Sequence, residues 1–442
     1  MLDDKLKALW TRISPPQKAA FFGCFLSGYL VHLYVFTNII PNSDGLSRIF
    51  DPQQMTVSGR WFLHFASYFN GFTQMPAVIG LFSVLFLALA AALAVSLLGI
   101  RSRALSALSG ALMAAFPAVG YTFLYLFTAS AYCFAIFLAV LSVSLARRGR
   151  WHWLAGCLLL ACSMGTYQAY VTVAIGLSLL VIFWETLDPS ASFSATLRLG
   201  VRLMLFLAAG AVLYYGILLV FLQVKDLELL SYLGMDAASS GYPFSRLPGL
   251  LLDTYKQVAA FFFLPGSANT FTSGWMAVLD LAALALGGGC FLLCMGQEGL
   301  WRARWRPLGG LAMLALLPLG INFGQILSPW SAPTPLMKYA FVLVYLAVVL
   351  LADRALPAAG AGAAVLRRRA APCAALWLVL LLLFSLNTNN RLYTASAQAH
   401  RATLSYATRL ASRIREAGME VVGMGERKTP KHFVVAWTPW LP

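Results

Sequence analysis

The stretch FFGCFLSGYLVHLYVFTNII, residues 21–40, is an uninterrupted apolar run, and the polar loop PNSDGLSRIFDPQQMTVSGRW, residues 41–61, follows it directly. An α-helix needs roughly 20 apolar residues to cross a bilayer, so the run has the length of a membrane span. The loop carries the carboxylates of Asp44 and Asp51 and the guanidinium of Arg60. Carboxylates beside a bilayer are costly unless they meet water, a metal or a cation. The stretch therefore predicts a spanning helix followed by a loop with a chemical role.

The composition places the whole chain among membrane proteins. Hydrophobic residues make up 60% of the chain, charged residues make up 11%, and the mean hydropathy is +0.75, which is typical of an integral membrane protein. The apolar runs lack the alternation of barrel strands, and lipid offers backbone groups no outside partner. We therefore predict an all-α polytopic membrane protein. The net charge of +16 lies mainly in short loops and comes with no nucleic-acid-binding module, so nucleic acid is excluded as a partner.

Length and hydropathy predict about eleven spans. The expected spans cover residues 18–40, 76–100, 104–127, 130–146, the two halves of 151–186, 203–222, 275–295, 308–327, 335–351 and 372–386. The run 151–186 is too long for one helix, and we expect it to turn at Gly165-Thr166-Tyr167-Gln168. The short apolar piece 258–264 resembles a re-entrant or interfacial segment more than a span.

The expected domains follow from these spans. Residues 1–17 form an N-terminal segment, residues 18–386 form the transmembrane domain with outer loops 41–75 and 223–256, and residues 387–442 form a polar tail. We expect the tail to be a small element with a helix over 394–417 and short strands at 420–422 and 432–437. The first span lacks a small-residue cleavage site, so we expect it to be retained.

The distribution of Lys and Arg predicts the orientation. Eighteen of them lie in one set of alternate loops and six in the other set, with the tail left out. Cytoplasmic loops carry the excess of Lys and Arg, so we predict a cytoplasmic N-terminus. Eleven spans then place the tail, and both long outer loops, on the periplasmic side.

Two carboxylates in the first outer loop are the candidate catalytic groups. Asp44 precedes Gly45 and Asp51 precedes Pro52, so each could also be an ordinary turn or cap residue. In the functional interpretation one of them is a general base that takes the proton of an acceptor hydroxyl, or a ligand for a divalent cation such as Mg²⁺ or Mn²⁺. The sequence does not decide between the two residues, and it names no certain cofactor.

Three cations on the same predicted side are candidates for phosphate binding. Arg60 lies in Ser58-Gly59-Arg60-Trp61, and its planar guanidinium could hold a phosphate or anchor the chain at the interface. Lys256 ends the long second loop and Lys338 opens the tenth span. A lysine at either place could bind a phosphate or extend its ammonium group to water.

Three further residues are candidates for contact with a sugar or an acceptor. Gln168 offers two donors and an acceptor to a hydroxyl-rich ligand, and Tyr167 beside it could equally be part of an interfacial aromatic belt. His64 follows Arg60 by four residues, so on a helix the two would share a face. An interfacial histidine without a binding role is the alternative.

These motifs carry a resemblance to a known family. Asn42-Ser43-Asp44-Gly45, then Gly59-Arg60-Trp61, and the turn Gly165-Thr166-Tyr167-Gln168 resemble the GtrII-type bacterial glucosyltransferases, which look like members of the GT-C superfamily. The resemblance covers roughly residues 20–390. It implies a GT-C-like bundle in the bacterial inner membrane, a polyprenyl-phosphate-hexose donor with glucose as the expected sugar, and a cell-surface glycan such as O-antigen as acceptor. It also implies that Asp44 serves catalysis in an inverting displacement.

Two other functions fit the sequence less closely. One is an O-antigen polymerase or ligase that works through the long second loop, and the other is a flippase or transporter of lipid-linked sugars. A transporter places ionisable groups near the middle of the membrane, often in two repeated halves. Here the acidic residues inside the expected spans are Asp280 and, one residue from the end of a span, Glu185, and there is no convincing internal repeat. Most of the varied polar residues lie in the outer loops, which favours a transferase.

Overall fold

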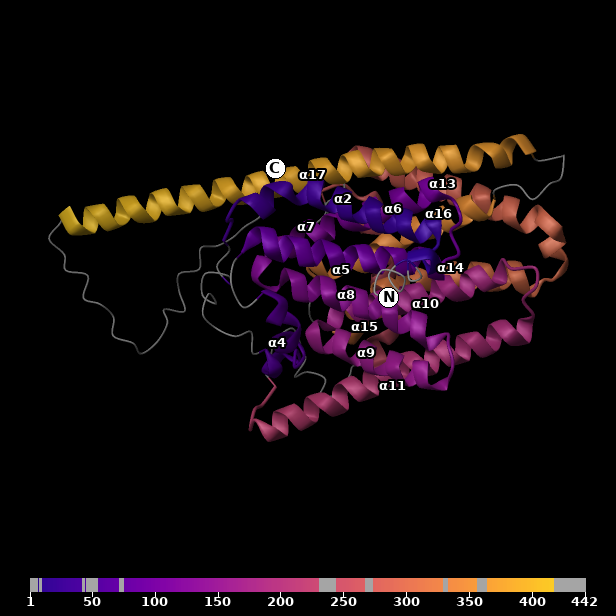
Figure 1. The fold of residues 1–442 in the computed structure, drawn as a ribbon, viewed down its shortest axis with the longest axis horizontal. Helices are drawn as coiled ribbons and strands as arrows, with labels where there is room; N and C mark the ends of the chain where they lie inside the picture. The colour runs from indigo at the N-terminus through magenta and orange to yellow at the C-terminus, as the bar shows by residue number, and fades with distance from the viewer. Residues whose placement is uncertain are drawn as a thin grey trace. The chain divides into compact units, whose positions relative to one another are not determined.

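The computed structural model covers the whole chain and describes residue 7 and residues 10–41, 44, 55–70, 75–229, 244–266, 273–328, 333–355 and 364–416. Within these ranges the secondary structure is helical, apart from one isolated β-bridge between Met55 and Arg60. The prediction of an all-α polytopic membrane protein is confirmed (Figure 1).

The longer helices are α2 (Pro15–Thr37), α5 (Pro76–Leu97), α6 (Arg103–Ala115), α8 (Leu126–Ala146), α9 (Arg150–Thr166), α10 (Val171–Thr186), α11 (Phe193–Val224), α12 (Leu247–Phe263), α13 (Gly274–Gly296), α14 (Trp305–Ile321), α16 (Val342–Arg354) and α17 (Ala364–Glu416). The shorter ones are η1 (Thr56–Ser58), α4 (Leu63–Ala66), η2 (Ser67–Asn70), α7 (Pro117–Phe123), η3 (Gln168–Tyr170), η4 (Phe244–Arg246), η5 (Gln297–Arg302), α15 (Phe323–Leu327) and η6 (Pro335–Phe341).

Each of the expected spans has a helical counterpart. Among the described residues, eight helices are long and apolar enough to cross a membrane, and the bent pair of α6 and α7 makes a ninth. Helices α9 and α14, which match the fifth and ninth expected spans, have only 17 residues each. Helix α12 does not count among the spans, in line with the re-entrant or interfacial piece expected there.

Local sequence signals explain where α2 begins. The Ser14 hydroxyl accepts the Gln17 backbone N–H at 3.4 Å, and the Gln17 side chain accepts the Ser14 backbone N–H at 2.9 Å. This capping box, with Pro15 in the first turn, satisfies backbone donors that the helix start leaves open. The cap starts the helix three residues before the expected span start at Lys18.

The first spans pack against each other through glycines. Helix α2 lies against both α5 and α6, as Figure 1 shows. A Cβ added to Gly23 would lie 2.2 Å from the backbone oxygen of Ala107, and one added to Gly110 would lie 2.1 Å from that of Ala20. The two backbones therefore meet at distances that only glycine permits, as small residues allow between helices in membranes.

The third expected span is broken near its middle. Helix α6 ends at Ala115, Phe116 is extended with ψ 130°, and α7 begins at Pro117 with a bend of 41°. Pro117 has no N–H to give to the carbonyl of Met113, and the bend removes the usual donors from the carbonyls of Ala114 and Ala115. Unpaired carbonyls inside a bilayer cost several kcal/mol each.

Three side chains from three other elements satisfy these carbonyls. Tyr339 of η6 donates its O–H to the oxygen of Met113 at 3.3 Å, and Asn389 of α17 donates to that of Ala115 at 2.7 Å. His32 of α2 lies with Nε2 2.9 Å from the oxygen of Ala114. Since a carbonyl only accepts, the proton of the ring is on Nε2, and Nδ1 of the neutral ring accepts the O–H of Tyr393 at 2.6 Å.

Side chains at one end of the bundle fix the turns there. Arg306 is buried and donates to the carbonyls of Thr186, Asp188, Pro189 and Ala191. The Asp353 carboxylate accepts the backbone N–H groups of Arg101 and Ser102 at 2.9 and 2.8 Å, which caps the start of α6. These turns belong to the loops rich in Lys and Arg, so we call this the arginine-rich end. The segment 55–70, η3, η6 and α15 lie at the other end of the spans, the opposite end.

The chain divides into two compact units, Met1–Thr394 and Ala395–Pro442. Helix α17 continues from Ala364 to Glu416 with Pro372 inside it, so the expected end of the eleventh span at Leu386 is not a helix end. The helix expected over 394–417 is present as far as Glu416. The expected strands at 420–422 and 432–437 lie outside the described residues.

Candidate functional site

The segment after the first loop folds into a tight turn that aims Arg60. Residues Thr56–Ser58 form η1, and Gly59 ends it with φ 77°, in the left-handed region that favours glycine. The backbone N–H of Arg60 then returns to the carbonyl of Met55 at 3.0 Å. The Ser-Gly-Arg-Trp motif is therefore a turn, not the start of a helix. His64 lies in α4 (Leu63–Ala66), which begins after Arg60. The two residues therefore do not share a helix face, contrary to the expectation from their spacing.

The second motif forms the turn between α9 and α10, as the sequence predicts. Helix α9 ends at Thr166, Tyr167 is extended with φ −157°, and η3 starts at Gln168. The carbonyl of Gly165 accepts the backbone N–H of Phe62 at 2.7 Å. A Cβ on Gly165 would lie 2.6 Å from the indole of Trp61. The two motifs, about a hundred residues apart, are thus docked against each other.

An amide clamp fixes the docked turn. Gln168 donates from Nε2 to the carbonyl of Ser58 at 2.8 Å and to the Tyr214 hydroxyl at 3.1 Å. The Tyr214 hydroxyl in turn donates to the carbonyl of Gly59 at 3.1 Å. Two consecutive carbonyls before Arg60 are therefore held by side chains from η3 and α11. Gln168 positions Arg60 in this structure, and the amide is committed to that task.

Arg60 lies on an aromatic platform. Its guanidinium carbon is 4.7 Å from the centroid of the Tyr167 ring, and Nη1 donates to the Tyr132 hydroxyl at 3.3 Å. The rings of Tyr132 and Tyr167 stack with centroids 4.6 Å apart, and Tyr170 meets Tyr167 edge-on at 5.4 Å. All three tyrosines are buried. A partly buried cation held over an aromatic face is a strong position for binding an anionic group.

Lys338 lies on a neighbouring element. The 3₁₀ segment η6 packs against η3, and its backbone departs from helical geometry at Lys338, with φ −90° and ψ 17°. The lysine is buried, with 7% of its surface exposed, and Nζ lies 5.7 Å from the centroid of the Phe261 ring. An ammonium group buried at this depth is expensive unless it serves an anion or another partner. The structure thus places Lys338 beside the turn that holds Arg60 in place.

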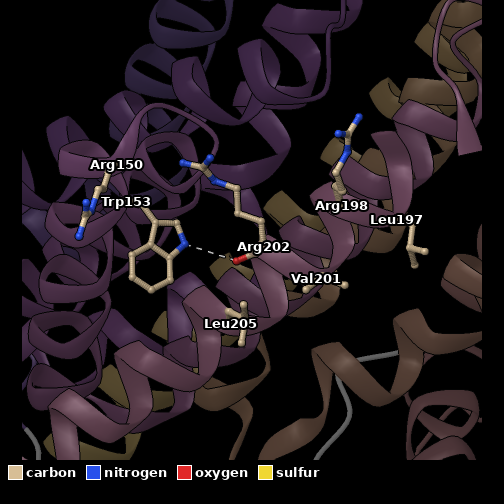
Figure 2. Close-up of a pocket in the computed structure, with 7 residues that line it drawn as sticks. All are labelled: Arg150, Trp153, Leu197, Arg198, Val201, Arg202 and Leu205. Carbon is tan, nitrogen blue, oxygen red and sulfur yellow. Dashed lines mark hydrogen bonds between the residues drawn. The ribbon is translucent and has the colours of Figure 1, made fainter. Parts of the chain in front are cut away.

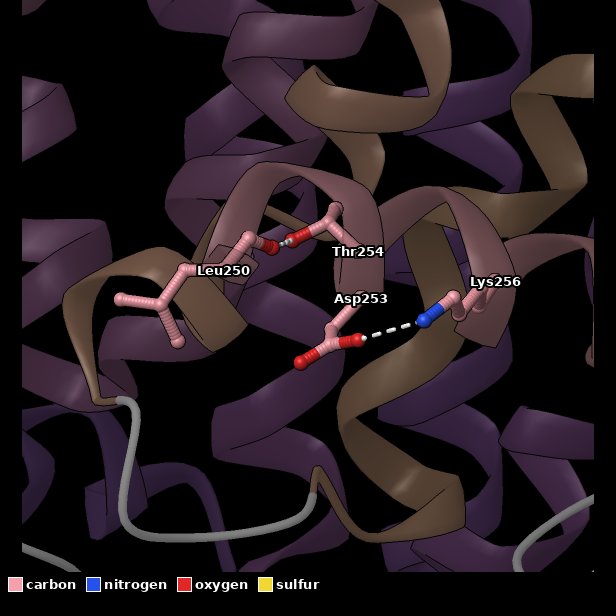
Figure 3. A network of polar contacts seen from close by, with 4 residues as sticks. All are labelled: Leu250, Asp253, Thr254 and Lys256. Atoms are coloured by element: carbon pink, nitrogen blue, oxygen red, sulfur yellow. Dashed lines mark hydrogen bonds and ion pairs between the residues drawn. The ribbon is translucent and has the colours of Figure 1, made fainter. Parts of the chain in front are cut away.

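Lys256 has a different environment. It lies on α12 with its ammonium 3.3 Å from the Asp253 carboxylate, and both side chains are more than half exposed (Figure 3). Thr254 is buried and bonds back to the carbonyl of Leu250 at 2.7 Å. The helix therefore presents Lys256 on its exposed face and Thr254 on its packed face.

Asp44, Asp51 and His64 are the remaining residues predicted for the site. Asp44 is helical and exposed, and Asp51 lies outside the described residues. His64 is half-buried and its ring meets that of Phe65 edge-on at 5.6 Å. In the described part of the chain, no group of three or more His, Cys, Asp or Glu side chains gathers where it could hold a metal ion.

Several residues at the opposite end were missed by sequence analysis. Tyr132 and Tyr214 come from the middle of apolar runs, where tyrosine gives no separate signal. Asn322 is 3% exposed and donates to the Gln257 side chain at 3.1 Å, and Gln325 nearby is 6% exposed. Buried amides near the end of a span require partners, so the Asn-x-x-Gln spacing after the ninth apolar run could have indicated this group.

The family described as Glucosyl transferase GtrII matches residues 33–351, well over half of the chain. The chain belongs to the GtrII glucosyl transferase family. No curated protein and no solved structure matches it.

The GtrII match covers the site just described. It begins within α2 and ends within α16, so it includes Asp44, Arg60, Gln168 and Lys338. Membership confirms the resemblance that the motifs indicated and identifies the chain as a glycosyltransferase. All of α17 and all of the second unit lie beyond the match.

Proposed function

We propose that this GtrII family member transfers a hexose, with glucose as the expected sugar, from a polyprenyl-phosphate donor to a cell-surface glycan such as O-antigen. In this proposal the protein lies in the bacterial inner membrane with its N-terminus in the cytoplasm, and both the site and the C-terminus are on the periplasmic side. One observation carries the proposal: Arg60, held by the Gln168 clamp, lies on the Tyr132–Tyr167 platform at the opposite end.

The donor phosphate is the group that this arrangement suits best. A polyprenyl phosphate keeps its tail in the bilayer and presents its phosphate at the interface. Arg60 lies on the turn that Gln168 of η3 holds, and Lys338 lies on η6, which packs against η3. Both cations stabilise charge that grows on the phosphate as the bond to the sugar breaks. Lys256, exposed and paired with Asp253, acts in the approach of anionic ligands.

The sugar lies beside the Arg60 turn in this proposal. His64, on the short helix that follows this turn, is a proposed sugar contact. The buried rings of Tyr132 and Tyr167 stack on each other beneath the guanidinium, so they support the cation. Gln168 holds the turn through Nε2, and its expected contact with the sugar stays part of the proposal.

The transfer is a single displacement. A carboxylate of the first loop, Asp44 or alternatively Asp51, takes the proton of the acceptor hydroxyl. The acceptor oxygen forms its bond to the anomeric carbon from the side opposite the phosphate, and the carbon–oxygen bond to the phosphate breaks. Polyprenyl phosphate leaves with the electron pair, and the configuration of the sugar inverts.

The test is a transfer assay on purified protein in lipid nanodiscs, with polyprenyl-phosphate glucose, acceptor glycan and detection by mass. Asp44→Asn should lower the rate by roughly 10²- to 10⁴-fold, the usual contribution of a general base. The matched control is Asp226→Asn, an exposed aspartate at the same end, which should keep the wild-type rate. Arg60→Lys, which keeps the charge and loses the planar contact, should raise KM, whereas Arg246→Lys should not.

The outcomes separate the parts of the proposal. Loss of rate in Asp51→Asn but not in Asp44→Asn would move the base to Asp51, and full rate in both would remove the carboxylate step. If the wild type transferred nothing from polyprenyl-phosphate sugars but used another donor, the donor would be wrong while the family assignment stood. Chain extension in place of single-sugar addition would favour a polymerase.

A further inference from the structure

A groove of about 520 Å³ lies at the arginine-rich end, at the other end of the spans from the transferase site (Figure 2). The first turn of α9 and the first four turns of α11, two helices that pack together, form its walls. Its lining consists of three arginines, one tryptophan and three aliphatic residues: Arg150, Trp153, Leu197, Arg198, Val201, Arg202 and Leu205.

The floor of the groove is apolar. Leu197, Val201 and Leu205 follow each other at intervals of four residues, so they form one stripe along α11, and they are 54%, 43% and 54% exposed. Only 28% of the apolar window of α11 is buried inside the protein, against 83% for the span formed by η6 and α16. Leu197 and Val201 lie just before the expected span 203–222, and Leu205 lies within it. The stripe therefore leads from the edge of the bilayer onto a largely exposed helix, and acyl chains are the natural cover for it.

The rim of the groove is cationic, and one of its arginines is fixed. Arg202 donates from Nε to the carbonyl of Ala146 at 2.7 Å and from Nη2 to that of Arg148. The Trp153 indole N–H donates to the carbonyl of Arg202 at 3.4 Å, the bond drawn in Figure 2. These bonds join α8, α9 and α11 and hold the groove open.

The other two arginines are available to a ligand. Arg150 and Arg198 are exposed and rise from opposite walls of the groove. Among the described residues, no carboxylate forms an ion pair with Arg150, Arg198 or Arg202. Three guanidiniums above an apolar floor are complementary to a ligand that has a phosphate at one end and hydrocarbon at the other.

We propose that this groove binds an anionic phospholipid from the leaflet at the arginine-rich end. The headgroup phosphate lies between Arg150 and Arg198, and one acyl chain follows the stripe of Leu197, Val201 and Leu205. A soluble phosphate would leave this apolar stripe uncovered, and a zwitterionic lipid would bring no net charge to the rim. The site is separate from the glycosyl-transfer chemistry, so its test does not depend on sugar transfer.

The test uses photoactivatable phosphatidylglycerol, with the purified protein in phosphatidylcholine nanodiscs. Labelling should be saturable and should map to peptides from α9 and the start of α11. Arg150→Gln with Arg198→Gln should weaken binding about thirtyfold, because each arginine near an anionic surface contributes roughly a factor of five. The matched control, Arg101→Gln with Arg103→Gln, removes two exposed arginines from the same end and should bind as the wild type does.

A second variant tests the apolar floor without changing any charge. Val201→Trp fills the stripe with a bulky ring and should prevent saturable labelling while all three arginines remain. Arg202 is left unchanged because its removal would disturb the end of α8. Wild-type binding by the double arginine variant would overturn the proposal. Equal labelling by phosphatidylcholine would also overturn it, as would complete competition by inorganic phosphate at the concentration of the labelled lipid.

Discussion

The amide clamp makes Gln168→Ala the most informative single change. The substitution removes the donor to the Ser58 carbonyl and the donor to the Tyr214 hydroxyl. Ser58 is buried, with 3% of its surface exposed, so its carbonyl loses its partner where water does not easily replace it. An unsatisfied buried acceptor costs about 1–3 kcal/mol, and the second hydrogen bond adds about 1 kcal/mol.

The expected loss is therefore about 2–4 kcal/mol in the docking of the turn that carries Arg60. If this docking positions Arg60 on the donor phosphate, kcat/KM falls roughly thirtyfold to several hundredfold. Tyr214→Phe leaves the Ser58 bond in place but removes the donor to the buried Gly59 carbonyl and the acceptor of the second Gln168 bond, so it should also cost about 2–4 kcal/mol. Gln168→Glu keeps the size but cannot donate when ionised, so it should be no better than alanine.

The assay is initial-rate sugar transfer in nanodiscs, with thermal unfolding followed on the same samples. The matched control is Gln223→Ala, which removes an exposed amide near the end of α11 and should leave kcat/KM unchanged. The reasoning is refuted if folded Gln168→Ala and Gln168→Glu both keep kcat/KM within twofold of the wild type. A full loss in Tyr214→Phe with none in Gln168→Ala would show that the Gly59 contact holds the turn and the Ser58 contact contributes nothing.

Three further predictions follow from the same structure. Gly165→Ala places a Cβ 2.6 Å from the Trp61 indole and should destabilise the protein by about 1–3 kcal/mol; adding Trp61→Phe should recover part of the loss in thermal unfolding, and no recovery would contradict the clash. Arg306→Lys cannot reproduce bonds to four carbonyls and should cost about 2–4 kcal/mol, whereas the exposed Arg304→Lys should cost nothing measurable. Burial raises the pKa of Asp188, but hydrogen bonds from Ser190 and the charges of Arg354 and Arg306 outweigh it and lower the pKa below the usual value. The ionised carboxylate therefore stabilises the fold at a pH above the unfolded-state pKa, and this stabilisation is lost as the pH falls through the lower folded-state pKa. The difference in unfolding free energy between wild type and Asp188→Asn should disappear in acid. A difference that stays constant with pH would show that the carboxylate charge is not involved.

The helices and the two motifs that meet at the Arg60 site, Ser58–Trp61 and Gly165–Gln168, could be found from the sequence because each depends on a local pattern. Apolar length marks a span, and the Gly-Thr-Tyr-Gln turn interrupts a run too long for one helix. What the sequence could not show is that Trp61 fits against Gly165 and that Gln168 reaches Ser58, since neither contact leaves a local signal. For the same reason Gln168 was expected to contact sugar, whereas the structure uses its amide to hold the backbone.

Arg304 and Arg306 also show that local sequence does not reveal contacts between distant parts of the chain. Arg306 and Arg304 are two residues apart and count equally in a charge comparison of loops. Arg306 is buried among carbonyls, whereas Arg304 is exposed. Burial depends on the turn after α10, more than a hundred residues earlier, so no window around Arg306 contains the information. The third span was expected to be continuous over 104–127, and the structure breaks it at Pro117. Tyr339 and Asn389, which make the break tolerable, are too distant in the chain to be assigned from the sequence around it.

The broken span has a consequence for the biosynthesis of the protein. His32 precedes Ala114 by 82 residues, so it has already left the ribosome when the break is made. Tyr339 follows Met113 by 226 residues and Asn389 follows Ala115 by 274. At roughly 5–20 residues per second, the last partner arrives roughly 14 to 55 s after the break. During that interval two bare carbonyls must stay hydrated or shielded by the insertion machinery, so this span enters the lipid in its final form only after Asn389 has been made.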